Sequence, residues 1–376
     1  MSAGLRGARK ARGWSQERLV RELEQYARQN LTDVASTASL RVYVSEWENG
    51  KRVISDRYAA ILRRLFGITD DELRDAPTLA VPPTTDGYDV LLKRIDMASS
   101  VGLGMVKTMN DQTELLRTMD RQMGAAAIVD QMTGHLSALE DSLSFAVLPD
   151  ARRPVALALA GAASLAAWQA LDTGAVERAW RHYELAKKAA LDADAPMYLA
   201  HAMGEQAYVL CDAGRPALAV DLVRDAQRII GTSGSPRLLA WLSATEAEIC
   251  AQAGLLDGCR RALAAAVATI PGGSEDRDPD MLSIFLNEAH LARWRGNVLA
   301  LLGDDDAVGS LYGALDVMDP TFVRAQASVR CDLAQAHLAR GEYQEADSNV
   351  RQARLLASRT GSVRHRRRIN LLAERL

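Results

Sequence analysis

Apolar residues recur every three or four positions over most of this chain, which is the spacing of one buried face of an α-helix. In the first 75 residues the pattern predicts short helices separated by glycines. One covers Leu5 to Arg12, a second begins at Ser15, a third covers Ser39 to Arg52 and a fourth begins at Ser55. The periodicity therefore predicts an all-α protein that starts with a small helical domain.

The predicted third helix has two distinct faces. Leu40, Val44 and Trp47 fall on one side, and Gly50 supplies the left-handed residue that ends a helix. The other side carries a polar and aromatic front followed by two cations. These outward residues are Arg41, Val42, Tyr43, Glu46, Asn49, Lys51 and Arg52. A short helix of this kind suits insertion into a DNA major groove.

The neighbouring helices complete a compact domain. Leu19 and Leu23 give the second helix a buried face, and Gly67 ends the fourth. Thr69 and Glu72 have the spacing of a capping box, which predicts a fifth short helix.

The motif residues of this domain resemble those of the phage-repressor (XRE) type of helix-turn-helix. The resemblance is carried by Arg9, Gly13, Ser15, Gln16, Leu19, Trp47, Glu48, Asn49, Gly50, Lys51 and Gly67. About a dozen extra residues separate Leu19 from Ser39, so helix two or its turn is extended between Arg28 and Ala38. The resemblance implies a double-stranded DNA operator as partner.

The same resemblance assigns roles within the domain. It implies an internal ion pair between Arg9 and Glu48. Phosphates would be approached by Gln16 and Asn49, and base edges by Arg41, Val42 and Tyr43.

A repeated pattern fills the C-terminal half. Glycines recur as Gly174, Gly214, Gly254, Gly303 and Gly341. Small or apolar residues follow each glycine at fixed offsets. The positions are Ala179, Ala219, Cys259, Val308 and Ala346, then Tyr183, Val223, Leu263, Tyr312 and Val350, then Ala186, Ala226, Ala266, Leu315 and Ala353. Repetition at about 40 residues predicts a solenoid of helix pairs and resembles tetratricopeptide repeats. The long fourth interval predicts a solvent loop from Pro271 to Asp280.

The resemblance to these repeats places a set of side chains on the concave face of the array. They are Trp168, His201, Tyr208, Trp241, Glu248, His290, Arg293, Asn297 and Gln335. Aromatic walls with a few polar groups suit a peptide or small organic effector, and Arg293 could hold its carboxylate. Each residue singly is also compatible with plain packing or a paired surface charge.

Between these regions the sequence predicts a linker over residues 76–88 and connecting helices over residues 89–149, before the array at 150–376. Gly102, Gly104 and Gly124 mark expected breaks. Ile95, Met109, Leu116 and Met123 lie on a seven-residue lattice. This stripe is either a core surface beneath the repeats or the seam of a homodimer.

Charge is unevenly distributed. Up to Arg64 the chain has 13 Lys or Arg and 7 Asp or Glu, a net +6, whereas the whole chain is at −3, which leaves −9 for the rest. Only the N-terminal domain has the sign that phosphate contacts need. The abundant arginine is equally compatible with a GC-rich genome. The terminal run from Arg364 to Arg368 is expected to be a solvated helix end, with a DNA or partner contact as the alternative.

The sequence contains none of the common motifs of catalytic, nucleotide-binding or metal sites. The four cysteines form no CxxC pair, and no HExxH, P-loop, GxGxxG or GxSxG motif occurs. We therefore expect no catalytic residues, no metal and no cofactor. The apolar stretch from Val155 to Leu171 is rich in alanine and is expected to be a packed soluble helix, with no membrane association. The N-terminus lacks a signal-peptide pattern, which favours the cytoplasm.

Together these patterns resemble signal-responsive regulators of actinobacterial type. The prediction is a dimeric, sequence-specific transcriptional regulator whose array senses a peptide or small molecule. The alternative is an adaptor that acts through a protein partner with weak or no specific DNA binding.

Overall fold

The computed structural model describes residues 5–30, 32–49, 51–68, 87–99, 102–272, 277–278, 281 and 283–376. The chain divides into two compact units, Met1–Leu92 and Lys93–Leu376, and the division falls inside helix α6 (Gly87–Ser99). All regular elements in the described residues are helical, apart from one isolated β-bridge between Arg277 and Phe285.

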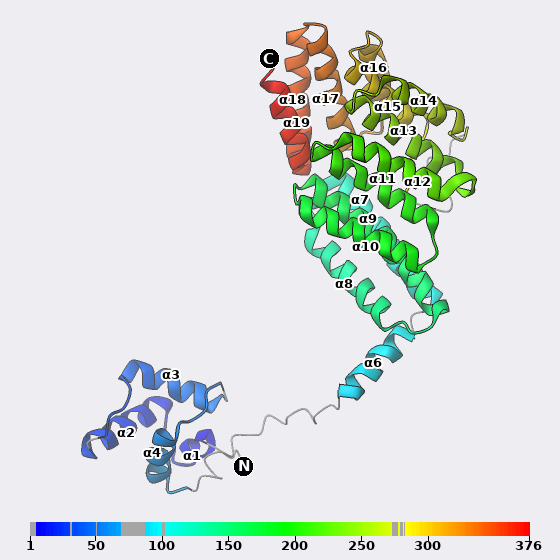
Figure 1. The fold of residues 1–376 in the computed structure, drawn as a ribbon. Coiled ribbons are helices and arrows are strands. Elements are labelled where there is room, and N and C mark those ends of the chain that lie inside the picture. Colours follow the sequence, from blue (N-terminus) through cyan, green and yellow to red (C-terminus); the bar gives the residue numbers. More distant parts are fainter. Residues whose placement is uncertain are drawn as a thin grey trace. The chain divides into compact units, whose positions relative to one another are not determined.

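The first unit forms a small domain around a common core. Its helices are α1 (Leu5–Ala11), α2 (Gln16–Gln29), α3 (Thr37–Glu48) and α4 (Asp56–Phe66) (Figure 1). Leu19, Leu23, Leu40, Val44 and Leu62 are among the side chains buried in its core. The apolar spacing in the sequence predicted these inward faces, and the structure confirms them.

The helix ends agree with the predictions at several points. Ser15 caps α2 by accepting a hydrogen bond from the backbone of Arg18, and Gly67 ends α4 with φ +62°. The third helix starts two residues earlier than predicted, at Thr37, because Ser36 rather than Ser39 caps it. The extra residues before it lengthen the α2–α3 connection.

Several expectations for this domain fall on residues outside the described part of the chain. They are the helix stop at Gly50, the capping box of Thr69 and Glu72, and most of the linker at 76–88.

The second unit is a continuous stack of helix pairs, and two further helices pack against the first pair (Figure 1). The lower helices are α7 (Leu103–Met123) and α8 (Val129–Phe145), joined by a 3₁₀ turn, η1 (Ala125–Ala127). The pairs are α9 (Pro149–Asp172) with α10 (Val176–Asp192), α11 (Pro196–Asp212) with α12 (Pro216–Ile230), α13 (Pro236–Gln252) with α14 (Leu256–Thr269), α15 (Glu288–Leu302) with α16 (Ala307–Asp316), and α17 (Val323–Ala339) with α18 (Tyr343–Thr360). A short 3₁₀ turn, η2 (Gly231–Ser233), follows α12, and α19 (Val363–Ala373) closes the chain.

The turn glycines behave as the repeat pattern predicted. All five lie between the two helices of a pair with φ between +69° and +80°, a conformation that glycine adopts without strain. The small residues that follow them are fully buried in most repeats, including Ala179, Ala219, Cys259 and Ala346. The unit is therefore a tetratricopeptide-like helical-repeat array.

The fourth repeat departs from the predicted register by one residue. Ala307, Leu311 and Ala314 are buried there, whereas Val308 is half-buried and Tyr312 is 38% exposed. Helix α16 starts four residues after Gly303, whereas the other second helices start two residues after their glycines, and its buried positions lie one residue nearer the glycine than theirs do. A one-residue shift turns a helix by about 100°, which replaces the whole inward set.

Of the predicted solvent loop from Pro271 to Asp280, the structure describes residues 271–272 and 277–278, and Gly272 among them is exposed. Asp278 is buried, as are Met281, Ile284 and Leu286 just after it. The Asp278 carboxylate accepts hydrogen bonds from the Ser235 hydroxyl and from the backbone N–H of Met281, 3.0 Å away. The buried Asp278 carboxylate thus ties the end of this segment to Ser235 at the start of α13.

Part of the methionine-rich stripe on α7 packs in the core of the array. Leu116 is buried and Met109 half-buried in a cluster shared with α8 and α9, whereas Met123 is 45% exposed. Leu116 and Met109 thus agree with the core alternative, and the homodimer seam stays a prediction. Gly104 lies inside α7 and does not break it, while Gly102 and Gly124 flank the helix as expected.

Helix α9 is long and apolar enough to cross a membrane by length and composition alone. However, 78% of its most apolar window is buried among the other helices of the described structure. Its neighbours are α7, α8 and α10, so it acts as a central core helix of the array.

Candidate functional site

The first candidate site is on the N-terminal domain, where one buried ion pair fixes α3. Arg9 Nε lies 2.5 Å from Glu48 Oε1 and its Nη2 lies 2.8 Å from Glu48 Oε2. Burial alone would raise the pKa of Glu48, but hydrogen bonds from Arg9 and Gln16 lower it. The predicted pair between the first and third helices is confirmed.

Two residues expected to approach phosphates have internal partners. Gln16 Nε2 donates to Glu48 Oε2 at 2.9 Å, which adds a third hydrogen bond to that carboxylate. Asn49 is exposed, and its Oδ1 accepts a hydrogen bond from Arg6 at 2.6 Å. Their contact with DNA stays a prediction.

The outer face of α3 separates into an exposed part and a packed part. Arg41, Val42 and, after the helix, Lys51 are exposed. Tyr43 is half-buried, and the Arg52 guanidinium lies 3.7 Å from the centre of its ring. Arg52 also pairs with Glu46 at 3.3 Å, so the structure brings Tyr43, Glu46 and Arg52 together.

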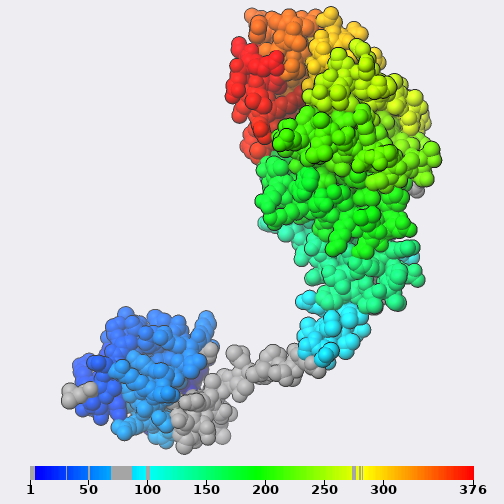
Figure 2. Space-filling view, viewed as in Figure 1, coloured from blue at the N-terminus to red at the C-terminus, as the bar shows by residue number. Residues whose placement is uncertain are grey.

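The second candidate site lies where the end of the array meets its beginning. Arg324 on α17 pairs with Asp120 on α7 and, at 3.3 Å, with Asp172 at the end of α9. Ser362, which caps α19, donates to Asp172 Oδ1 at 2.5 Å. A Cβ on Gly124 would overlap the carbonyl oxygen of Thr360, so only glycine permits this approach. In Figure 2 the C-terminal residues, drawn red, border the green residues of the earlier repeats.

The electrostatics of this junction differ between its two carboxylates. Burial would raise the pKa of Asp172, but the neighbouring His365, the charge of Arg324 and a hydrogen bond from Ser362 lower it to about 2. Burial dominates at Asp120 and raises its pKa despite Arg324. Asp172 is therefore the firmly ionised partner.

The terminal arginines are not a solvated helix end, contrary to the sequence-based expectation. Arg364 forms a bidentate pair with Asp212 on α11, at 2.7 and 3.1 Å, and lies 5.6 Å from the Trp168 ring and 5.5 Å from the Tyr208 ring. Arg368 pairs with Asp332 on α17 at 2.5 Å. Only the arginines between them, such as Arg367, are exposed.

A cavity of about 510 Å³ lies between α19 and the inner ends of the repeats. This size matches sites for small organic ligands. Its lining comprises Leu171, Gly174, Val176, Asp212, Ala213, Glu248, Gln252, Asn297, Leu301, Ser328, Val363, Arg364, His365, Arg367, Arg368 and Leu371.

Glu248 lines the cavity from α13. Its Oε2 accepts hydrogen bonds from the Tyr208 hydroxyl at 3.0 Å and from Trp294 Nε1 at 2.9 Å. Burial and the neighbouring Glu248 carboxylate raise the pKa of Tyr208, so its hydroxyl keeps the proton that it donates. Nearby, burial raises the pKa of the Cys211 thiol to about 12.

The residues predicted to face the groove are dispersed. Asn297 lines the cavity, and Trp168 and Tyr208 contact Arg364 beside it. His201 and Trp241 are buried against each other with ring centres 5.0 Å apart.

The remaining predicted residues lie elsewhere. His290 lines a separate cavity of about 170 Å³ together with Phe285 and Phe322. The Arg293 guanidinium lies 4.6 Å from the ring of Trp294, and Gln335 accepts a hydrogen bond from Arg375 at 2.8 Å. Ligand contacts of all these residues stay predictions.

A repeated position in the sequence could have revealed several missed residues. Asp172, Asp212 and Gln252 each stand two residues before a turn glycine in three consecutive repeats. In the structure Asp212 and Gln252 line the cavity, and Asp172 accepts a hydrogen bond from Ser362 at the start of α19. Polar residues at the last turn of successive inner helices thus mark the cavity rim.

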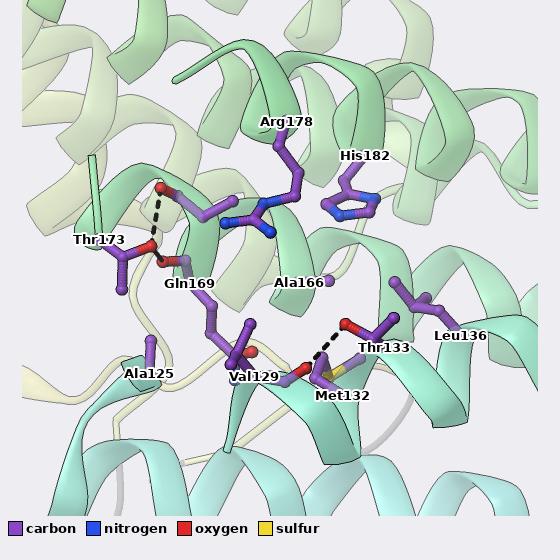
Figure 3. A pocket seen from close by; sticks show the side chains of 11 residues that line it. Ala125, Val129, Met132, Thr133, Leu136, Ala166, Gln169, Thr173, Arg178 and His182 are labelled. Carbon is purple, nitrogen blue, oxygen red and sulfur yellow. Dashed lines mark hydrogen bonds between the residues drawn. The ribbon is translucent and has the colours of Figure 1, made fainter. Parts of the chain in front are cut away.

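A third pocket, between α8, α9 and α10, is too small for an organic ligand. Arg178 and His182 from α10 point toward Gln169 and Thr133 across it (Figure 3). Its volume is about 30 Å³, the scale of one or two water molecules. No group of three or more metal-ligating side chains occurs among the described residues.

The fold and the cavity define a tetratricopeptide-like helical-repeat protein with a ligand-sized space enclosed by its last helix. A Rap protein complexed with competence and sporulation factor is similar in structure, at 13% identity over 96% of this chain and 97% of that chain, with a TM-score of 0.48. Aspartyl phosphate phosphatase F from Bacillus subtilis is similar at 12% identity over 91% of this chain and 94% of that chain, with a TM-score of 0.44. No family model matches the chain, and no curated protein matches its sequence significantly.

Proposed function

We propose that this chain is a DNA-binding regulator whose repeat array binds a small effector or peptide. The observation that carries the proposal is the division of α3 into two faces. Leu40, Val44 and Trp47 are buried, while Arg41 and Val42 are exposed on the opposite side. A helix held rigidly by one face and exposed on the other can enter a major groove.

The effector half of the proposal is supported by the cavity beside α19. It is lined by helices from all five repeats and by the C-terminal helix, and its volume of about 510 Å³ fits a small molecule or a few residues of a peptide. An occupant there would contact α19, whose arginines join it to distant repeats.

A homodimer would give the protein two DNA-binding domains. Helix α6 exposes Val90, Leu91 and Leu92 (44%, 42% and 55%), an apolar surface that a second copy could cover. Paired domains read half-sites about 34–36 Å apart, so a change in dimer geometry would alter operator fit. A ligand shifts DNA affinity only by its preference between two array conformations.

The test is binding of the purified chain to genomic DNA fragments, including its own upstream region, at several salt concentrations. We expect a saturable site whose affinity falls steeply with salt and exceeds that of shuffled fragments. Equal affinity for all fragments, or none, would overturn the DNA-binding half.

An adaptor that acts through a protein partner is the second candidate function. The exposed apolar side chains of α6 favour it, because they suit a different protein as well as a second copy. A monomeric chain without a DNA site would favour the adaptor.

A further inference from the structure

The chemistry of the 510 Å³ cavity is uneven: every cation in its wall comes from α19, and the repeats contribute acids and neutral acceptors. Arg364 and Arg368 are already matched, because Asp212 and Asp332 pair with them at 2.5 to 3.1 Å. Their charges are therefore largely cancelled before any ligand enters.

Glu248 is not matched in this way. The two hydrogen bonds that it accepts come from neutral donors, the Tyr208 hydroxyl and the Trp294 indole, and both reach the same oxygen, Oε2. Arg364 and Arg368 interact with Glu248 only electrostatically, while their hydrogen bonds go to other carboxylates. Glu248 Oε1 thus has capacity for a further donor.

Asn297 provides an independent observation. It lines the cavity with only 4% of its surface exposed, and its Nδ2 donates to Asp332 Oδ1 at 2.7 Å. A carboxylate only accepts hydrogen bonds, so the amide atom of Asn297 that faces Asp332 is the nitrogen, and the remaining amide atom is the oxygen Oδ1. Asn297 Oδ1 and Asp332 Oδ2 are buried and have no hydrogen-bond partner among the described residues.

A buried acceptor without a hydrogen-bond donor costs free energy. A ligand with N–H groups would supply the donors that these acceptors lack. We propose that the cavity binds its effector through a positively charged ammonium or guanidinium group seated between Glu248 and Asn297. This deepens the proposed function and rests on it for the claim that the array takes an effector. Arg293, which was expected to hold a carboxylate, does not line this cavity, and its ligand contact stays a prediction.

Charge complementarity also orients such a ligand. Arg367 stands exposed at the rim of the cavity, whereas Glu248 and Asn297 lie deeper. A ligand that carries an ammonium at one end and a carboxylate at the other would therefore enter with its ammonium first. Small amines and the N-terminus of a short peptide share this chemistry.

The test uses the full chain and matched pairs of probes, read by thermal shift and calorimetry without DNA. The probes are agmatine, arginine and the peptide amide Arg-Ala-Ala, each beside a neutral analogue in which the amine is N-acetylated and the guanidinium is replaced by a urea group. Saturable binding of the cationic probes above their neutral analogues supports the proposal. Equal or stronger binding of the neutral analogues, or binding by none of the probes, overturns it. Binding of agmatine alone points to a small amine, and binding of the peptide alone to a peptide N-terminus.

Three variants tie the binding to the site. Glu248→Gln should weaken the cationic probes by about 10-fold or more, because a charge-assisted bond becomes neutral. Gln252→Glu adds a carboxylate at an exposed position of the cavity wall, one turn along α13, and should strengthen them several-fold. Glu246→Gln is the matched control, because Glu246 pairs with Arg224 away from the cavity, and binding should stay within twofold.

Unchanged probe binding in both Glu248→Gln and Gln252→Glu would overturn the proposal. The outcome is separable from that of the proposed function. Cation binding that leaves DNA affinity unchanged would contradict the regulator but keep the site, whereas a saturable operator without cation binding would do the reverse.

Discussion

The two units of this protein both bury arginine–carboxylate pairs, but they use them differently. In the N-terminal domain Glu48 receives two hydrogen bonds from Arg9 and one from Gln16, within a stretch of 40 residues. In the array Arg324 is shared between Asp120 and Asp172, which lie 204 and 152 residues away. The first arrangement fixes one helix in a small domain, whereas the second joins the two ends of a solenoid.

The largest effect is expected from Arg324→Leu. This change leaves two buried carboxylates without their shared cation, and losing one partner of a buried pair already costs about 3–5 kcal/mol. We expect the array to lose about 5 kcal/mol or more, measured by urea unfolding of the full chain. Asp120→Asn is the matched control: Arg324 keeps Asp172, so the loss should be much smaller. Equal losses would show that Arg324 does not hold the closure.

Glu48→Gln tests the ion pair of the N-terminal domain. It leaves the Arg9 guanidinium buried without its carboxylate and should cost the N-terminal domain about 3–5 kcal/mol. Hydrogen exchange of the full chain would show the loss in α1 and α3 and leave α9 to α19 protected. Unchanged exchange in the domain would mean that the apolar core alone holds α3.

The ion pairs of the two units also differ in how far the sequence could predict them. Arg9 and Glu48 belong to the motif that resembles the phage-repressor helix-turn-helix, so their pairing could be predicted from that resemblance. The helices, turn glycines and small buried residues of the array were equally accessible, because they repeat at a fixed interval. The partners of Arg324, Arg364 and Asp278 could not be predicted, since they depend on how far the stack curves, and no local spacing encodes that.

The register error in the fourth repeat has the same origin. Val308 and Ala307 are both acceptable as small residues beside a turn, so composition could not choose between them. The actual choice follows from where α16 starts after Gly303.

Glu205 extends the comparison to a buried carboxylate without an arginine partner. Its side chain is 15% exposed, its Oε1 lies 3.7 Å from His201 Nε2, and its Oε2 has no hydrogen-bond partner among the described residues. Burial raises the pKa of Glu205 from its ordinary value of 4.5 to about 8. The folded state thus keeps a proton that the unfolded state has lost between these pH values, so stability falls as pH rises from about 4.5 to about 8.

Glu205→Gln should remove that dependence. We expect the variant to be more stable than the parent by roughly 2 kcal/mol at pH 8.5 and similar to it at pH 4.5. Urea unfolding at the two pH values measures this. Parallel stability curves for parent and variant would show that Glu205 does not carry the proton.

The smallest effect on stability is expected from an exposed arginine. Arg41 lies 3.9 Å from Glu17, and both side chains are more than 60% exposed, so Arg41→Ala should change stability by less than about 0.5 kcal/mol. On a specific operator the same change should cost about 1–3 kcal/mol by anisotropy titration. Lys51→Ala should instead weaken all sequences alike and reduce the salt slope by about one phosphate. Unaltered site preference in Arg41→Ala would show that this face of α3 does not read bases.

The meeting of α19 with α9 and α11 constrains how the array can evolve. An open solenoid gains or loses whole repeats easily, since each unit contacts only its neighbours. Here a duplicated or deleted helix pair would carry Arg364 away from Asp212 and Ser362 away from Asp172, whatever the quality of the new packing. Repeat number is therefore fixed by closure rather than by local stability, and variation should be confined to the outer helices and their turns.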